Sequence, residues 1–154
     1  MPDPSEFIVQ DFGDRKWTSS LKSIREFDLI ISGYSIHHID NASKRRLYND
    51  IYKLLRPGGI FLNLEHVSSP AENLEQLFHE LFDDGMMDYQ EYIGDPKTRE
   101  EIDAIYNDPE HRKMNLLESV EKQCGWLREN GFKEVDCYIK IFELALFGGM
   151  KPDS

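Results

Sequence analysis

Residues 27–67 read FDLIISGYSIHHIDNASKRRLYNDIYKLLRPGGIFLNLEHV, and the order of patterns in this stretch decides the fold. The apolar run at residues 27–31 is too short for a helix and rich in β-branched residues, which predicts a strand buried on both faces. Asp40 then offers an N-cap oxygen, and apolar residues at helical spacing predict a helix that the Pro-Gly-Gly turn at residues 57–59 stops. A second buried strand at residues 60–64 completes a βαβ unit with parallel strands.

Weaker patterns on both sides of this stretch predict further elements. The apolar run at residues 7–10 predicts a short strand followed by a turn. A helix is expected over residues 71–82, ended by the Asp-Asp-Gly turn that follows, and residues 86–114 are polar and broken by glycine and proline. With one more helix near residues 98–106, the insertion at about residues 70–115 is expected to form a cap outside the core.

The last part of the chain predicts one helix and two strands. Asn115 is expected to begin the helix, with Glu118 as its capping-box partner, and Gly131 is expected to end it. Alternating apolar residues over 135–141 predict a strand with one wetter face, and residues 144–147 predict a last strand closed by two glycines. At 154 residues the chain is therefore expected to be a single α/β domain.

The charge of the chain is strongly negative and unevenly distributed. The formal net charge is −11, from 18 basic and 29 acidic side chains, which disfavours a nucleic-acid partner because phosphate backbones are repelled. Residues 71–115 hold 13 of the acidic and only 4 of the basic side chains, so the remainder is nearly balanced. Such an acidic run is most simply a solvated face.

The sequence carries no sign of a membrane or metal site. No apolar run approaches the about 20 residues that a membrane span requires, and the acidic start does not resemble a signal peptide, so a cytoplasmic protein is expected. Cys124 and Cys137 lack metal-type spacing and are expected to be reduced thiols. No P-loop, zinc pattern or nucleophile triad is present, and no metal is expected.

The runs FDLIISGYSIHHI and LLRPGGIFLNLEHV resemble the fourth and fifth strands of class I S-adenosylmethionine (SAM) dependent methyltransferases, and the resemblance extends over about residues 7–150. It implies a Rossmann-like, mostly parallel sheet with an antiparallel last strand, in which residues 7–10 form the third strand. The ending GFKEVDCYIKIFELALFGG more loosely resembles the branch of carboxy-SAM synthase and its tRNA wobble-uridine relatives. The implied activity is methyl transfer from SAM to a small molecule.

The family's glycine-rich turn after its first strand, and the ribose-binding acid after its second, are absent from this sequence. The chain therefore resembles the C-terminal two thirds of a methyltransferase, as a truncated or split enzyme. The alternatives are a non-catalytic remnant or regulatory subunit that dimerises and, with less support, another Rossmann-like nucleotide binder. Loss of two central strands would expose the edge at residues 29–32, so a homodimer or an N-terminal partner fragment is expected, unless residues 7–10 close the gap.

The resemblance also implies residues that bind the cofactor. Asp11 would accept a hydrogen bond from the adenine amino group of SAM, and Phe12 would cover the ring. The other interpretation of Asp11 is that its side chain closes a turn. Ser32, Gly33 and Tyr34 follow a strand's carboxyl end, where open α/β sheets bind ligands, and would contact the methionine part of SAM.

Four further polar residues come directly after the two parallel strands. His37 and His38 would belong to the turn or to the wall of a pocket, and adjacent helical residues point in different directions, so they are not expected to share a metal. Glu65 and His66 are candidates for a general base. Because methyl transfer from a sulfonium often needs only positioning, that base is optional.

The cap offers a second set of candidates for contact with a substrate. Its tyrosines would wall the substrate pocket or simply anchor the cap. A cap arginine would meet a substrate carboxylate, as the resemblance to carboxy-SAM synthase implies. These cap residues are Tyr89, Tyr92, Tyr106 and Arg112.

Overall fold

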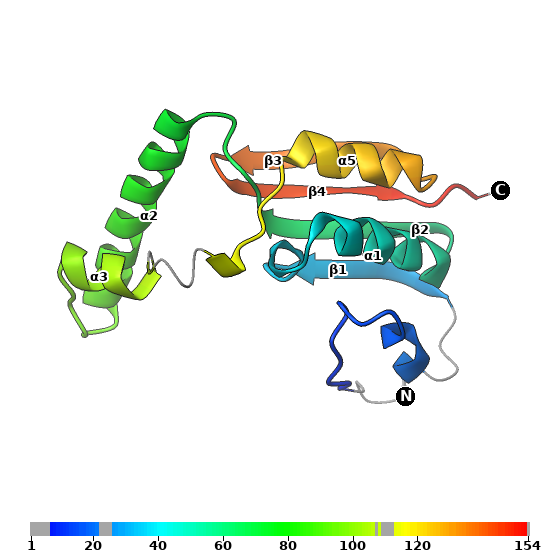
Figure 1. The fold of residues 1–154 in the computed structure, drawn as a ribbon, viewed down its shortest axis with the longest axis horizontal. Helices are drawn as coiled ribbons and strands as arrows, with labels where there is room; N and C mark the ends of the chain where they lie inside the picture. Colours follow the sequence, from blue (N-terminus) through cyan, green and yellow to red (C-terminus); the bar gives the residue numbers. More distant parts are fainter. Residues whose placement is uncertain (1–6, 22–25, 107, 109–112, 154) are drawn as a thin grey trace.

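Four strands form one mixed sheet in the structure, a computed structural model that describes residues 7–21, 26–106, 108 and 113–153 (Figure 1). The strand order is β1-β2-β4-β3. β1 and β2 are parallel, and β4 is antiparallel to both of its neighbours, so three strands share one direction and the last strand opposes them, as predicted. The strands are β1 (Phe27–Gly33), β2 (Leu55–His66), β3 (Lys133–Ile141) and β4 (Leu144–Met150).

Helix α1 (Asn41–Leu54) joins the two parallel strands, and its predicted cap is confirmed. Asp40 Oδ1 accepts a hydrogen bond from the Ser43 backbone N–H at 2.8 Å. The helix ends at Leu54, before the Pro-Gly-Gly turn that was expected to stop it. Leu55 already has extended backbone and pairs with Phe27 of β1, so β2 begins there and the turn residues lie inside the strand.

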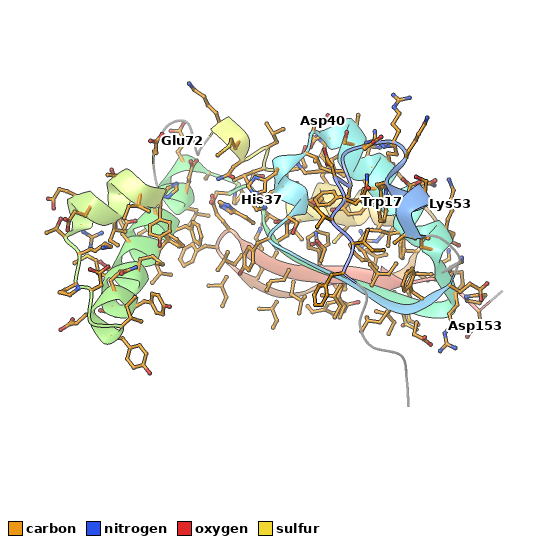
Figure 2. All side chains as sticks on the ribbon, turned by 90° about the horizontal axis from the view of Figure 1, so that it is seen from below. Trp17, His37, Asp40, Lys53, Glu72 and Asp153 are labelled. Atoms are coloured by element: carbon orange, nitrogen blue, oxygen red, sulfur yellow. The ribbon has the colours of Figure 1, made fainter. Side chains whose placement is uncertain are left out.

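The core lies between the sheet and the two helices that cover one of its faces, α1 and α5 (Val120–Glu129) (Figure 2). Fully or almost fully buried side chains come from both layers. The Tyr48 hydroxyl on α1 donates a hydrogen bond to Gln123 Oε1 on α5 at 2.6 Å, which ties the two helices together. The largest fully buried apolar side chains are Tyr48, Phe61, Phe132 and Phe147.

The prediction that residues 27–31 are buried on both faces is wrong. β1 is an edge strand, and no helix of the described chain covers the second face of the sheet. Ile30 points to the core, whereas Leu29 is 47% exposed and Ile31 is 66% exposed on the opposite face. Apolar side chains on both faces of a strand favour burial, but they are buried only where another layer of the fold packs on that face.

The predicted strand at residues 7–10 is also wrong. These residues form no strand and pair with no part of the sheet, and Phe7 is 93% exposed. The chain after them folds onto α1 through the short helix η1 (Trp17–Leu21), where Trp17 Nε1 donates to Asp50 Oδ2 at 3.2 Å and Arg46 donates to the Gly13 carbonyl at 2.7 Å (Figure 2). The alternative that residues 7–10 close the gap by pairing with β1 is therefore wrong.

Helices α2 (Glu72–Tyr92) and α3 (Arg99–Tyr106) form a helical pair that projects from one end of the sheet (Figure 1). α2 runs through Gly85, where the sequence predicted its end. One exposed glycine costs a helix only about 1 kcal/mol, and packing against α3, such as the contact of Phe82 with Tyr106, outweighs it. Among the described residues, no helix is long and apolar enough to cross a membrane.

Two boundaries in the last third of the chain differ from prediction. α5 begins after Ser119, whose Oγ accepts a hydrogen bond from the Lys122 backbone N–H, rather than at Asn115. Gly131 follows the helix with a left-handed φ of +100°, as predicted. β4 continues through Gly148 instead of ending before it. A glycine is needed at this position of the strand, because the Phe61 carbonyl oxygen lies where a Cβ would stand.

The place where α1 ends gives a stability prediction. Leu55 is fully buried and Leu54 only half-buried, so Leu55→Ala should lower the free energy of unfolding by about 2–5 kcal/mol and Leu54→Ala by clearly less. Urea unfolding followed by circular dichroism measures both. Equal losses would mean that the helix continues to the Pro-Gly-Gly turn.

Both cysteines are free thiols, and their reactivity should differ. Burial raises the pKa of Cys124 to about 11, so at pH 8 almost no thiolate forms there. The pKa of Cys137 is also raised by burial, but this thiol is only half-buried. We expect a disulfide reagent at pH 8 to modify one thiol per native chain and two in urea, and rapid modification of both in the native chain would contradict this.

Candidate functional site

A cavity of about 580 Å³ opens at the carboxyl ends of β1 and β2, between the sheet and the helical pair α2–α3. Ligands of open α/β sheets bind at this edge. The volume lies within the range of about 300–1,000 Å³ that is usual for small-molecule sites. The cavity is lined by histidines and aromatic rings, namely Tyr34, His37, His38, His66, Phe78, His79, Phe82 and Tyr106, together with Asn115 and Leu144.

The carboxylate of Glu65 holds the ring of one of these histidines, His37, in place. This carboxylate is fully buried and contacts the His37 ring, with 2.5 Å between Oε1 and Nδ1. Oε2 accepts hydrogen bonds from the backbone N–H groups of Ile36 at 2.8 Å and His37 at 3.2 Å, and Oε1 accepts one from the His66 N–H at 2.9 Å. Glu65 thus orients the His37 imidazole and fastens helix η2 (Ile36–His38) to the end of β2.

A carboxylate on Nδ1 determines the chemistry of the other ring nitrogen. With Nδ1 donating to Glu65, the neutral His37 imidazole keeps its lone pair on Nε2. His37 is 7% exposed and lines the cavity, so a ligand in the cavity reaches the ring while bulk water largely does not. The pair has the arrangement of a general base with its orienting carboxylate.

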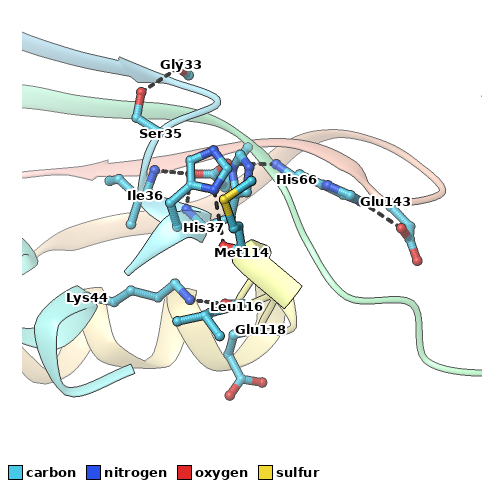
Figure 3. A network of polar contacts seen from close by, with 12 residues as sticks. Gly33, Ser35, Ile36, His37, Lys44, His66, Met114, Leu116, Glu118 and Glu143 are labelled. Carbon is cyan, nitrogen blue, oxygen red and sulfur yellow. Dashed lines mark hydrogen bonds and ion pairs between the residues drawn. The ribbon is translucent and has the colours of Figure 1, made fainter. Parts of the chain in front are cut away.

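A second histidine–carboxylate pair adjoins the first (Figure 3). His66 Nε2 lies 2.8 Å from Oε2 of Glu143, which is 2% exposed in the turn between β3 and β4. Burial alone would raise the pKa of Glu143, but the hydrogen bond with His66 holds it below its usual value. The His37 and His66 rings meet edge to face with centroids 5.7 Å apart, so both pairs serve one cavity.

The chain that leads from the helical pair to α5 closes the far side of the site (Figure 3). Leu116 N–H donates to the His37 carbonyl at 2.8 Å, and His38 Nδ1 lies 3.2 Å from the Met114 carbonyl oxygen. The buried Lys44 ammonium donates to the Leu116 carbonyl, and burial lowers the pKa of Lys44 although Glu65 opposes that shift. These contacts hold both histidines of η2 in place.

The residues predicted to bind the cofactor separate into two places. Phe12, Ser32 and Gly33 line a second, mostly apolar groove of about 270 Å³ beside β1. Asp11 Oδ1 accepts a hydrogen bond from the Gly13 N–H at 2.7 Å, so its side chain closes a turn, as the second interpretation proposed. Tyr34, with a left-handed φ of +49°, lines the larger cavity instead.

This second groove is small for a complete cofactor site. Its volume lies below the about 300–1,000 Å³ of complete small-molecule sites. It offers an aromatic ring from Phe12 and an open backbone at Gly33, where an added Cβ would meet no atom within 4 Å. Among the described residues, no group of three or more His, Cys, Asp or Glu side chains is placed to hold a metal ion.

The predicted cap residues lie in different places. Tyr89 and Tyr92 are 53% and 87% exposed on α2 and do not line the cavity, which corrects the prediction that they wall a pocket. Tyr106 does line it. Arg112 lies outside the described residues. Sequence reasoning missed Glu143 and Phe78, although pairing of residues 144–147 with β2 would have brought Glu143 beside His66.

Comparison with known proteins shows which fold this chain resembles. Residues 5–63 match a family model described as a methyltransferase domain, and no curated protein matches the chain. An O-methyltransferase family protein from Burkholderia thailandensis has a TM-score of 0.60 at 15% identity, over 97% of this chain and 36% of that chain. The chain therefore has, in part, the fold of a class I SAM-dependent methyltransferase domain.

Two further solved structures give the same result. Human N-acetylserotonin methyltransferase in complex with SAM has a TM-score of 0.55 at 16% identity, over 96% of this chain and 34% of that chain. The CurJ carbon methyltransferase has a TM-score of 0.55 at 16% identity, over 92% of this chain and 34% of that chain. This chain thus spans about a third of the length of these methyltransferases.

The hydrogen bonds of Glu65 lead to a prediction about stability. An amide in Glu65→Gln cannot accept at both of its ends, so one buried backbone N–H or the His37 ring loses its partner, at a cost of about 1–3 kcal/mol. Glu134→Gln, on the exposed edge of β3, is the matched control and should change the unfolding free energy little. Equal stability of the two variants in urea would show that the Glu65 network contributes nothing net.

Proposed function

We propose that this chain is the acceptor-binding part of a SAM-dependent methyltransferase that acts on a small molecule. One observation carries the proposal: the buried Glu65 carboxylate contacts the His37 ring, which lines an aromatic cavity. This cavity lies at the sheet edge where such folds bind ligands. The methyltransferase-like fold supports the reaction class, and the cavity supports a small acceptor.

His37 would serve the reaction as general base. Its Nε2 lone pair accepts the proton of an acceptor O–H or N–H as that atom becomes the nucleophile, and Glu65 stabilises the resulting imidazolium. Glu65 itself is enclosed by its hydrogen bonds, so it acts as a positioning residue through His37 rather than on the acceptor. His66, oriented by Glu143, is the second group able to bond the acceptor.

The aromatic rings around the cavity supply the remaining requirement, which is orientation. A methyl displacement needs the acceptor atom in line with the methyl donor, and rigid walls hold it there. Phe78 and Phe82 of α2 and Tyr106 of α3 line the cavity together with the histidines, and the Phe78 ring lies 5.7 Å from the His66 ring between centroids. They exclude water that would otherwise solvate the nucleophile.

SAM would supply the electrophilic methyl group. Phe12, Ser32 and Gly33 would hold the part of it that reaches the groove beside β1. Because that groove is small and the sequence lacks the glycine-rich turn, this chain alone should bind the cofactor product S-adenosylhomocysteine weakly or not at all. The same observation favours the second candidate function, a non-catalytic, methyltransferase-like regulatory subunit.

The proposed base is tested by methyl transfer from radiolabelled SAM to a set of small phenols, amines and thiols. His37→Ala should reduce transfer about 100-fold or more, since positioned bases contribute about 10²–10⁴-fold. His38→Ala is the control, because the His38 ring lines the same cavity and packs on His37 with centroids 3.8 Å apart, but its Nδ1 contacts the Met114 carbonyl oxygen and not Glu65. This variant should reduce transfer less than His37→Ala. Equal effects of the two substitutions would contradict the assignment of the base.

A binding measurement separates the two candidate functions. In ¹⁵N-correlated NMR spectra, weak binding of S-adenosylhomocysteine should shift the backbone amides of Phe12, Ser32 and Gly33. Shifts elsewhere only would mean that the groove beside β1 is not the cofactor site. No shifts and no methyl transfer would mean that this chain is not active by itself, which favours the regulatory subunit.

A further inference from the structure

The second histidine–carboxylate pair gives the cavity a second hydrogen-bond acceptor (Figure 3). With His66 Nε2 donating to the buried Glu143, the neutral His66 ring keeps its lone pair on Nδ1. His37 keeps its lone pair on Nε2 for the same reason, because its Nδ1 contacts Glu65. Within the described part of the chain, neither of these two lone-pair nitrogens has a hydrogen-bond partner. Both are therefore left for a ligand.

Contacts inside the described chain fix the orientation of both rings. Glu65 is fully buried and Glu143 is 2% exposed, and each lies beside the end of β2. The backbone carbonyl of Glu143 accepts a hydrogen bond from the Val67 N–H at 2.7 Å, which fastens the turn between β3 and β4 to the site. The two imidazole rings meet edge to face with centroids 5.7 Å apart. The wall thus presents two acceptors close together.

The rest of the cavity wall is largely aromatic. The Phe78 ring lies 5.7 Å from the His66 ring, and the Phe82 ring lies 6.2 Å from Phe78 and 5.5 Å from Tyr106, between centroids. None of the described residues that line the cavity is a Lys, Arg, Asp or Glu. A charged ligand would find no permanently charged partner on this wall, and a charge without a partner is costly to desolvate. The wall therefore suits a flat, neutral ligand.

We propose that the methyl acceptor is a neutral aromatic ring with two hydroxyl or amino groups on neighbouring ring atoms, one bound by His37 and the other by His66. The inference rests on the proposed function in taking the cavity as the acceptor site. Two accepting nitrogens on adjoining rings require two donors on one side of the ligand. Neighbouring ring positions place the donors on one side, whereas positions across the ring point them in opposite directions. His66 is then a residue that determines specificity.

The two acceptors also distinguish the acceptor molecule from its product. When the oxygen beside His37 takes the methyl group of SAM, its proton passes to His37 Nε2 and the sulfur keeps the electron pair of the broken bond. The product has exchanged one of its two donated hydrogens for a methyl group. It keeps the hydrogen bond to His66 only, so it should bind less tightly than the acceptor.

Titration calorimetry with catechol and its isomer hydroquinone tests the inference without the methyl donor. The two ligands have the same atoms and the same number of donors, and only the positions of the hydroxyl groups differ. At pH 8, under nitrogen, catechol should bind this chain about 10-fold more tightly, which is the effect of one further hydrogen bond. The methylated product 2-methoxyphenol should bind less tightly than catechol. Equal affinities of the isomers, or no binding of either at millimolar concentration, overturn the inference.

Two substitutions test the part of His66. His66→Phe keeps an aromatic ring but removes both nitrogens, so it should abolish the preference for catechol over hydroquinone. His79→Phe is the matched control, because His79 also lines the cavity but its ion-pair partner Glu75 lies 3.7 Å away and is 51% exposed. This variant should keep the preference. A preference for catechol that survives His66→Phe overturns the assignment.

Nitrogen signals of the histidine rings give a readout that does not depend on the folding of a variant. In long-range ¹H–¹⁵N spectra of the unmodified chain, catechol should shift both His37 Nε2 and His66 Nδ1, and hydroquinone only one of them. Both shifts without methyl transfer from SAM would support the inference and mean that the chain is not active by itself. Methyl transfer to both isomers with equal affinity would support the proposed function and overturn the inference.

Discussion

The hydrogen bonds of one buried carboxylate organise the functional end of this protein. Glu65 stands at the end of β2 and accepts from backbone N–H groups of η2 and of His66, while its other contact orients the His37 ring. A buried charge is tolerated only when it is fully paired, so the turn after β1 must stay where Glu65 can reach it. The same contacts that stabilise this turn orient the His37 ring for the proton transfer that we propose.

The sheet itself is covered on one side only, which distinguishes it from a complete doubly wound fold. α1 and α5 bury one face (Figure 2). On the opposite face, apolar residues of the outer strands such as Ile31 and Ile139 stay exposed. Parallel strands are normally covered on both faces. In the part of the chain that the structure describes, the second face of the sheet therefore stays uncovered by any helix.

Much of this arrangement could be predicted from local patterns. The Asp40 cap, the parallel β1–β2 pair and the left-handed Gly131 follow from short-range chemistry, and the structure confirms them. The failures occur where contacts between distant residues compete with local signals. Gly85 did not end α2 because packing on α3 outweighed it, and Leu55 left the helix because it pairs with Phe27. Glu143 has no local signature at all and becomes a site residue only through the β2–β4 register.

The sequence by itself determined the order of the elements and the class of fold, because hydrophobic periodicity and turn residues act over a few positions. It also placed His37, His38, Glu65 and His66 near the ligand edge. Only the tertiary structure decided their contacts, since the His37 ring takes the orientation of the proposed base because a particular carboxylate, here 28 residues further along the chain, is buried against it. Exposure of β1 was likewise decided in three dimensions, because burial depends on which layers are present and not on the residues that favour it.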